Sequence, residues 1–153
     1  MCLITEQKKP IKIRKDRIVY KTGYGGFVNG KMRVLFTPYN KFKYELNKLY
    51  ETKFTYLPTS SKDAIGHDDM VTVAYGWKSE RVLNSSLIVI AAGFHAATKK
   101  QRLKTTYYDL VECVIPKGSL IYEDKTGLIV SNKIIIKKEV FNTNYTENIY
   151  LKQ

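Results

Sequence analysis

Leu87–Tyr122 reads LIVIAAGFHAATKKQRLKTTYYDLVECVIPKGSLIY, and this stretch decides the expected fold. Its first four residues are apolar and rich in β-branched side chains. Because the run is too short to span a membrane, it predicts a buried strand. Gly93 follows the run and can adopt the positive φ of a sharp turn. We therefore expect an elbow that presents Phe94 and His95 at the end of a strand.

The rest of this stretch predicts a helix and a second strand. Thr98–Arg102 has the pattern of a short basic helix. Leu110–Ile115 alternates in polarity, which favours a strand, and Pro116–Gly118 has the composition of a turn. The expected order is therefore strand, glycine elbow, helix and strand.

Alternation of apolar and polar residues predicts further strands on both sides of this stretch. They are expected at Arg17–Lys21, Phe27–Val28, Met32–Phe36, Met70–Tyr75, Gly127–Ser131 and Lys133–Lys137. Asn29-Gly30 favours a type I′ hairpin between the second and third of these segments. Thr22–Gly26 is expected to be a glycine-rich loop, which either turns N–H groups toward an anion or belongs to the hairpin.

One further helix is expected after the hairpin. In Tyr39–Tyr50, the apolar residues Phe42, Leu46 and Leu49 recur at helical spacing and predict a short amphipathic helix. Tyr44–Tyr50 also fits an extended strand. Together these segments predict an α+β fold of mostly antiparallel strands with one or two short helices.

The length of 153 residues fits one compact domain, residues 1–153. Within it, residues 1–16 are expected to form a basic N-terminal arm or edge strand, and residues 142–153 a polar tail. The two cysteines are too few for a disulfide framework. The absence of a leader and of a long apolar run favours the cytoplasm of a bacterial host, or a virion, and no contact with membranes.

The charge of the chain indicates acidic partners. Lys and Arg number 26 against 14 Asp and Glu, for a formal net charge of +12. Such a field attracts nucleic acid or an acidic protein surface. The residues expected to contact nucleic acid are Lys8, Lys9, Lys12, Arg14, Lys15 and Arg17. The alternative is a solvated edge strand whose lysines oppose aggregation. The sequence carries no signal for an oligomeric state.

A second candidate site surrounds the glycine elbow. His95 precedes a basic segment, an environment suited to an anion, and it alternatively only fills the turn. The candidate ligand-binding residues are Gly93, Phe94, His95, Lys99, Lys100, Arg102, Tyr20 and Lys21. No metal site is expected, because the adjacent residues His67, Asp68 and Asp69 cannot all point at one ion.

Two resemblances add to these expectations. Met1-Cys-Leu3, Val19–Lys21, Tyr44–Tyr50, Gly93–Ala96 and Ile115–Gly118 resemble segments of small proteins of unassigned function encoded by bacteriophages and prophages. Tyr20-Lys21 and Gly93–Ala97 also resemble, at the level of the fold, two strand-borne motifs of the ADP-ribosyltransferase superfamily. Lys21 and His95 then stand where that family has His and Tyr, and Gly127 or Leu128 stands at the place of its catalytic Glu.

We therefore expect a phage-type accessory protein that acts as a noncatalytic binding module for nucleic acid or a nucleotide-like anion, without a cofactor. One alternative, implied by the resemblance, is an ADP-ribosyl-processing enzyme with a degraded catalytic set. It would use NAD, with His95, Lys21 and either Glu123 or Asp124 as catalytic residues. The other alternative is a structural virion component that contacts the genome or neighbouring subunits.

Overall fold

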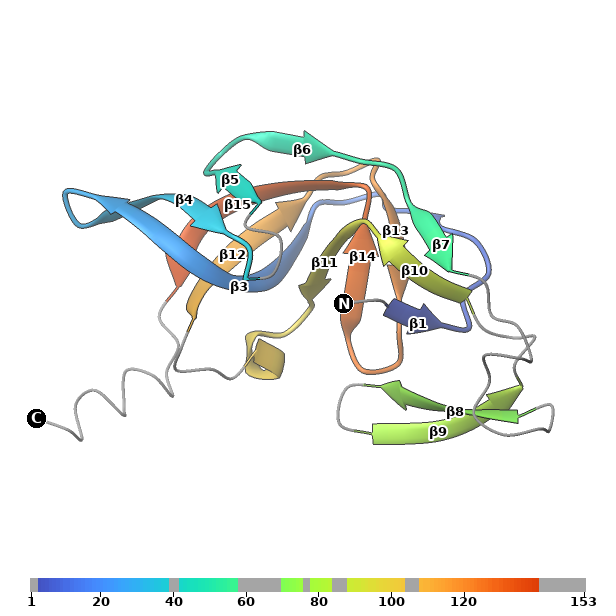
Figure 1. Cartoon of the computed structure of the whole chain (residues 1–153). Helices are drawn as coiled ribbons and strands as arrows, with labels where there is room; N and C mark the ends of the chain where they lie inside the picture. The colour runs from blue at the N-terminus through green and yellow to red at the C-terminus, as the bar shows by residue number, and fades with distance from the viewer. Residues whose placement is uncertain are drawn as a thin grey trace, which may run out of the picture.

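In the part of the chain that the structure describes, β-strands are joined by turns and by one turn of 3-10 helix (Figure 1). The computed structural model describes residues 3–38, 42–57, 70–75, 78–83, 88–103 and 108–140, and in it the side chains of 57, 70–75 and 78–83 are not described. The strands are β1 (Leu3–Thr5), β2 (Ile11–Lys12), β3 (Arg17–Val28), β4 (Lys31–Phe36), β5 (Lys43–Glu45), β6 (Leu49–Glu51), β7 (Thr55–Leu57), β8 (Met70–Tyr75), β9 (Lys78–Leu83), β10 (Ile88–Ala92), β11 (Phe94–Ala97), β12 (Asp109–Ile115), β13 (Leu120–Glu123), β14 (Leu128–Ser131) and β15 (Lys133–Val140). The 3-10 turn, η2, spans Lys100–Leu103.

This architecture shows that the α+β prediction was wrong. The chain is nearly all β, with large antiparallel sheets, and the described residues contain no α-helix. The mixed scaffold implied by the resemblance to ADP-ribosyltransferases is therefore not found. No helix among the described residues has the length and apolar character needed to cross a membrane.

The helix expected over residues 39–50 is replaced by β5 and β6. Tyr44 lies opposite Leu35 in the pairing of β5 with β4, and both side chains are buried in the core. Phe42 and Leu49, expected on the apolar face of a helix, are about half exposed. Asn47 has φ +62° and turns the chain between the two strands. Pairing with β4 thus overrides the local helical spacing.

The basic helix expected at Thr98–Arg102 is reduced to η2. The backbone N–H of Thr98 donates to the carbonyl of Gly127, which extends the contact of β11 with β14 by one residue. The turn that follows has no acidic residue to interact with its N-terminal N–H groups. Four residues are also far fewer than the roughly 12 to 15 that an isolated helix needs for stability.

The strands form two main sheets and a separate hairpin. The large sheet has the order β2-β13-β14-β11-β3-β12-β15-β6, with β4 pairing with β3 and β5 pairing with β4. A three-stranded sheet has the order β1-β10-β7, and β8 pairs with β9 in a two-stranded sheet. Every pairing is antiparallel, as expected for a chain whose connections are mostly short.

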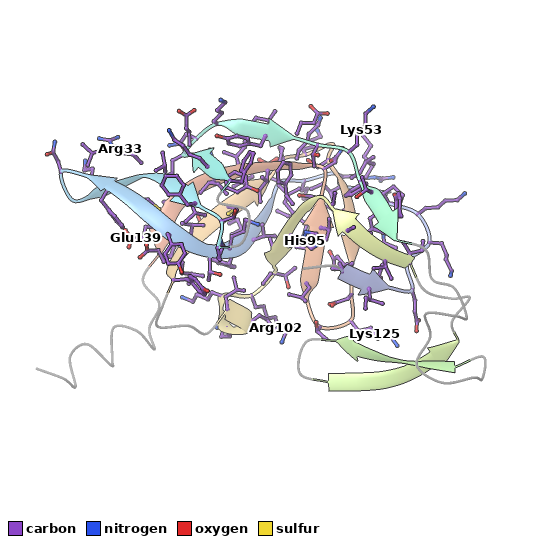
Figure 2. All side chains as sticks on the ribbon, viewed as in Figure 1. Arg33, Lys53, His95, Arg102, Lys125 and Glu139 are labelled. Atoms are coloured by element: carbon purple, nitrogen blue, oxygen red, sulfur yellow. The ribbon has the colours of Figure 1, made fainter. Side chains whose placement is uncertain are left out.

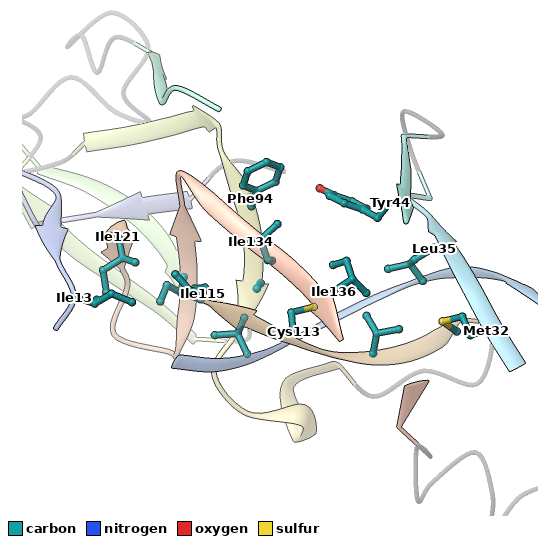
Figure 3. Packing of buried hydrophobic residues seen from close by; sticks show 14 residues of the cluster. Ile13, Met32, Leu35, Tyr44, Phe94, Cys113, Ile115, Ile121, Ile134 and Ile136 are labelled. Atoms are coloured by element: carbon teal, nitrogen blue, oxygen red, sulfur yellow. The ribbon is translucent and has the colours of Figure 1, made fainter. Parts of the chain in front are cut away.

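Side chains that alternate along the central strands build two cores on opposite faces of the large sheet. Figure 3 shows the larger one. Phe94, Ile121 and Ile129 belong to the larger cluster, which also receives residues of β3, β12 and β15. Their neighbours Tyr122 and Val130 belong to the smaller cluster, together with Leu3 and Ile90 of the three-stranded sheet. The middle of the large sheet is therefore buried on both faces.

The long hairpin of β3 and β4 confirms one local prediction and corrects another. Asn29 and Gly30 both have positive φ, as a type I′ turn requires, and Val28 pairs with Lys31 across it. Thr22–Gly26 is not a loop, because β3 continues through it and pairs first with β12 and then with β4. The tail at 142–153 and His67–Asp69 lie outside the described residues.

Candidate functional site

The large sheet splits where β3 leaves β11. These two strands pair at one position, where Ala97 lies opposite Tyr20. Continuing this antiparallel register would place Ala96 opposite Lys21 and His95 opposite Thr22, but these residues are not paired. From Tyr24 onward, β3 pairs with β4 instead. A gap thus opens inside the sheet between β11 and the end of β4.

A cavity of about 220 Å³ occupies this split. It is lined by Leu3, Tyr20, Lys21, Thr22, Thr37, Pro38, His95, Ala96, Leu103, Leu128 and Ile129. Most of the wall is apolar, and its polar side chains include Lys21, His95 and two threonines. The lining contains no carboxylate among the described residues. The cavity therefore suits a ligand with an apolar body and an electron-rich polar group.

Gly93 sets the direction in which β11 enters this site. It has φ +146°, a conformation that L side chains rarely adopt. A Cβ at this position would overlap Cγ1 of Val130 and would press on the ring of Phe54. The elbow therefore requires glycine, and it places Phe94 in the large core while His95 lines the cavity.

Lys21 supplies the positive charge in the cavity. Its ammonium group donates a hydrogen bond across the split to the carbonyl oxygen of His95. The Nζ atom also lies 5.8 Å from the ring centroid of Tyr44, in a cation–π contact. Burial lowers the pKa of Lys21 from 10.5, because desolvation disfavours the charged form. An ammonium has three donors, so the described residues leave donors of Lys21 for a ligand.

His95 is held in place by its own backbone turn. Its Nδ1 lies 3.1 Å from the carbonyl oxygen of Gly93, whereas Nε2 is buried and has no partner within the described part of the chain. Burial and the charge of Lys21 lower the pKa of His95 from 6.5, against the weaker opposing effect of the carbonyls of Gly93 and Ile90. The imidazole is therefore neutral at physiological pH.

The other candidate reactive groups do not add a nucleophile or an acid to the cavity. Burial raises the pKa of the Cys113 thiol to about 12, so this cysteine stays protonated and packs in the large core. Glu123 forms an ion pair with Arg17 and does not line the cavity. Asp124 accepts hydrogen bonds from the backbone of Thr126 and Leu128 in its own turn. The structure therefore brings Lys21 and His95 together without either acid.

The basic residues after the elbow have different environments. Lys99 and Lys100 are exposed, and neither lines the cavity. Arg102 lies below His95 in η2, as Figure 2 shows, and its Nη2 donates a 3.0 Å hydrogen bond to Oγ1 of Thr126. Its Nε is buried and finds no acceptor in the described residues. Only Leu103 of this turn contributes to the cavity wall.

Sequence reasoning found Tyr20, Lys21 and His95 but missed most of the wall. The lining residues that it missed are Leu3, Thr22, Thr37, Pro38, Ala96, Leu103, Leu128 and Ile129. They come from separate strands and turns. Thr22 begins the glycine-rich segment that was expected to face an anion or to belong to the hairpin, and Leu128 was compared with a catalytic Glu, but neither was expected to line this site. The others carry no local signal of a site. The sheet pairing alone brings them together.

The basic N-terminal segment forms the edge of the large sheet, far along the strand order from the split. Among the described residues, β2 pairs with β13 alone. Lys8, Lys9, Lys12, Arg14 and Lys15 are exposed. Arg17 is half-buried and forms an ion pair with Glu123. The segment thus presents a row of cations at a sheet edge.

No family model, no curated protein and no solved structure matches this chain. In the described residues, no group of three His, Cys, Asp or Glu side chains is arranged to hold a metal ion.

Proposed function

We propose that this protein is a noncatalytic binding module whose cavity between β3 and β11 takes a nucleotide-like anion. The observation that carries the proposal is that Lys21 and His95 line one cavity, and that the described residues engage Lys21 in one hydrogen bond and leave Nε2 of His95 without a partner. Buried polar groups are normally satisfied, so a group supplied from outside accounts for both.

Charge and shape support an anionic ligand. Lys21 is the charged residue of the lining, and no carboxylate opposes it among the described residues. The net charge of +12 raises the local concentration of anions around the protein. The apolar side chains of Leu3, Leu103 and Leu128 offer a surface for the body of the ligand.

Replacing Lys21 should weaken binding of AMP strongly. A hydrogen bond to a charged group contributes about 1.5–3 kcal/mol, so Lys21→Met is expected to raise the Kd of AMP about ten- to hundredfold. Isothermal titration calorimetry at neutral pH and low salt measures this change. Because burial lowers the pKa of Lys21, wild-type affinity should also begin to fall at a pH below 10.5.

Lys48→Met is the matched control for this experiment. Lys48 is exposed and pairs with Glu45, and its removal changes the net charge by the same amount away from the cavity. Its Kd for AMP should stay within about twofold of wild type, since exposed charges contribute little. Equal losses in the two variants, or no binding of AMP by the wild type, would contradict the cavity as an anion site.

A second candidate function, binding of nucleic acid, rests on the basic edge at β2. Four exposed cations, Lys9, Lys12, Arg14 and Lys15, fall within seven residues of the sequence. Four phosphate contacts predict a slope of about −3.6 when the logarithm of affinity for duplex DNA is plotted against that of salt concentration, from about 0.9 per phosphate. Fluorescence anisotropy over a salt series measures the slope.

A double variant tests whether this edge is the contact. Lys12→Gln with Lys15→Gln should make the slope shallower by about 1.8, because two phosphate contacts are lost. Lys43→Gln with Lys53→Gln removes the same charge from exposed positions of the β5–β7 region and should leave the slope unchanged. If both double variants shift the slope alike, DNA responds only to net charge and the edge is not a binding surface.

A further inference from the structure

The tautomer of His95 determines which hydrogen-bonding group a ligand must present to its imidazole. Because the imidazole is neutral and Nδ1 faces the carbonyl oxygen of Gly93, Nδ1 carries the proton and donates to that oxygen. Nε2 is then an acceptor with a free lone pair. It is buried and unpartnered among the described residues, in a side chain that lines the cavity. A ligand must therefore bring a hydrogen-bond donor to Nε2.

Lys21 lines the same cavity and requires the opposite kind of group from a ligand, a hydrogen-bond acceptor. Its ammonium donates to the carbonyl oxygen of His95, and this is the hydrogen bond that the described residues offer it. The remaining N–H donors of Lys21 need a hydrogen-bond acceptor. A negatively charged oxygen is the best one, because it also offsets the desolvated charge of the ammonium group. The ligand therefore combines an anionic oxygen with a donor such as a hydroxyl group.

The volume of the cavity limits the size of the part of a ligand that it can enclose. Pockets that enclose drug-sized molecules measure roughly 300–1,000 Å³. The 220 Å³ found here holds a smaller unit. A single sugar phosphate fits this limit, whereas a dinucleotide could enter only in part. The apolar contacts of Leu3, Pro38 and Leu128 then face the carbon skeleton or an attached base.

We propose that the cavity recognises a sugar phosphate unit, free or as part of a mononucleotide, with its phosphate on Lys21 and a sugar hydroxyl donating to His95 Nε2. This inference rests on the proposed anion-binding function and specifies its ligand. It predicts that the cavity distinguishes phosphates that carry a hydroxyl from those that do not.

Calorimetry with three probes tests the inference. Ribose 5-phosphate should bind wild-type protein about tenfold more tightly than methyl phosphate, because methyl phosphate leaves the buried Nε2 unsatisfied. AMP should bind at least as tightly as ribose 5-phosphate if the ligand is a mononucleotide, and more weakly if it is a free sugar phosphate. Equal affinities for ribose 5-phosphate and methyl phosphate would overturn the hydroxyl contact and leave the anion site standing. No binding of any probe would refute the proposed function itself.

Two variants of His95 separate its contact with the ligand from its part in the turn. His95→Asn keeps a group that can donate to Gly93 but has no atom at the position of Nε2, so the tenfold preference should disappear. His95→Gln places an amide oxygen near the position of Nε2 and should restore much of the preference. Methyl phosphate should bind both variants as it binds wild type, since Lys21 is unchanged. A preference retained by His95→Asn would contradict the assignment.

The nitrogen-15 shifts of the imidazole provide a test that needs no variant. In the free protein, they should identify Nδ1 as protonated and Nε2 as unprotonated. Addition of ribose 5-phosphate should move the Nε2 signal toward that of a hydrogen-bonded acceptor, whereas methyl phosphate should not. A protonated Nε2 in the free protein would overturn the inference.

Discussion

Gly93→Ala is expected to destabilise the protein by about 2–6 kcal/mol, a large part of the stability of a typical domain of this size. The φ of +146° at this elbow costs a residue with a Cβ about 1–3 kcal/mol. The added methyl group would also overlap Cγ1 of Val130 and crowd the ring of Phe54 in the smaller core. Overpacking of this kind costs about 1–3 kcal/mol more. Urea unfolding followed by circular dichroism measures the loss.

Gly118→Ala is the matched control for the elbow. Gly118 also has positive φ, +89°, but nothing lies within 4 Å of the position that its Cβ would take. Only the backbone strain remains, so the expected cost is about 1–2 kcal/mol. Equal destabilisation by the two substitutions would show that Val130 and Phe54 yield to the methyl group. The elbow would then not depend on close packing.

Ile136→Ala should cost about 2–5 kcal/mol, whereas Ile135→Ala should cost about 1 kcal/mol or less. Ile136 is fully buried in the large core and lies opposite Cys113 on β12. Truncation removes buried methyl groups and leaves a cavity in the core. Ile135 points to the other face of β15 and is only half-buried. The same chemical unfolding experiment compares the two variants.

The pair of isoleucine variants tests the register of β15 directly. Successive side chains of a strand point to opposite faces, so a shift of one residue would exchange the roles of Ile135 and Ile136. A larger loss for Ile135→Ala than for Ile136→Ala would therefore contradict the register Cys113 opposite Ile136. The two substitutions are chemically identical, which removes side-chain size as an explanation.

Short-range signals predicted many of the strands. Alternation at Leu110–Ile115 corresponds to β12, and the apolar segments near the C-terminus correspond to β14 and β15. Asn29-Gly30 forms the expected hairpin turn because both residues tolerate positive φ. These features depend on a few neighbouring residues. Local conformational preference is therefore enough to predict them.

The helices were predicted wrongly because pairing partners distant in sequence decide between helix and strand. Phe42, Leu46 and Leu49 satisfy the helical spacing, yet Tyr44 gains more by packing opposite Leu35 in the core. The same residues also fit an extended chain, which was the alternative prediction for Tyr44–Tyr50. Secondary structure in such a segment follows the burial available to it.

The candidate site depended even more on tertiary structure. His95 and its elbow carry a local signal, and Lys21 lies at the end of a predicted strand segment. The cavity exists because β3 leaves β11 for β4 after the pair of Ala97 and Tyr20. No local pattern marks the residue at which a long strand changes partners.

By itself, the sequence determined the positive charge, the turn at Asn29-Gly30 and the elbow at Gly93, because each depends on the chemistry of one or a few residues. Only the tertiary structure decided that the chain is nearly all β, and that Lys21 meets His95 in a cavity. The three isoleucines of β15 illustrate the physical reason. They are identical in sequence, and only the partner strand determines that Ile134 and Ile136 face the core while Ile135 does not.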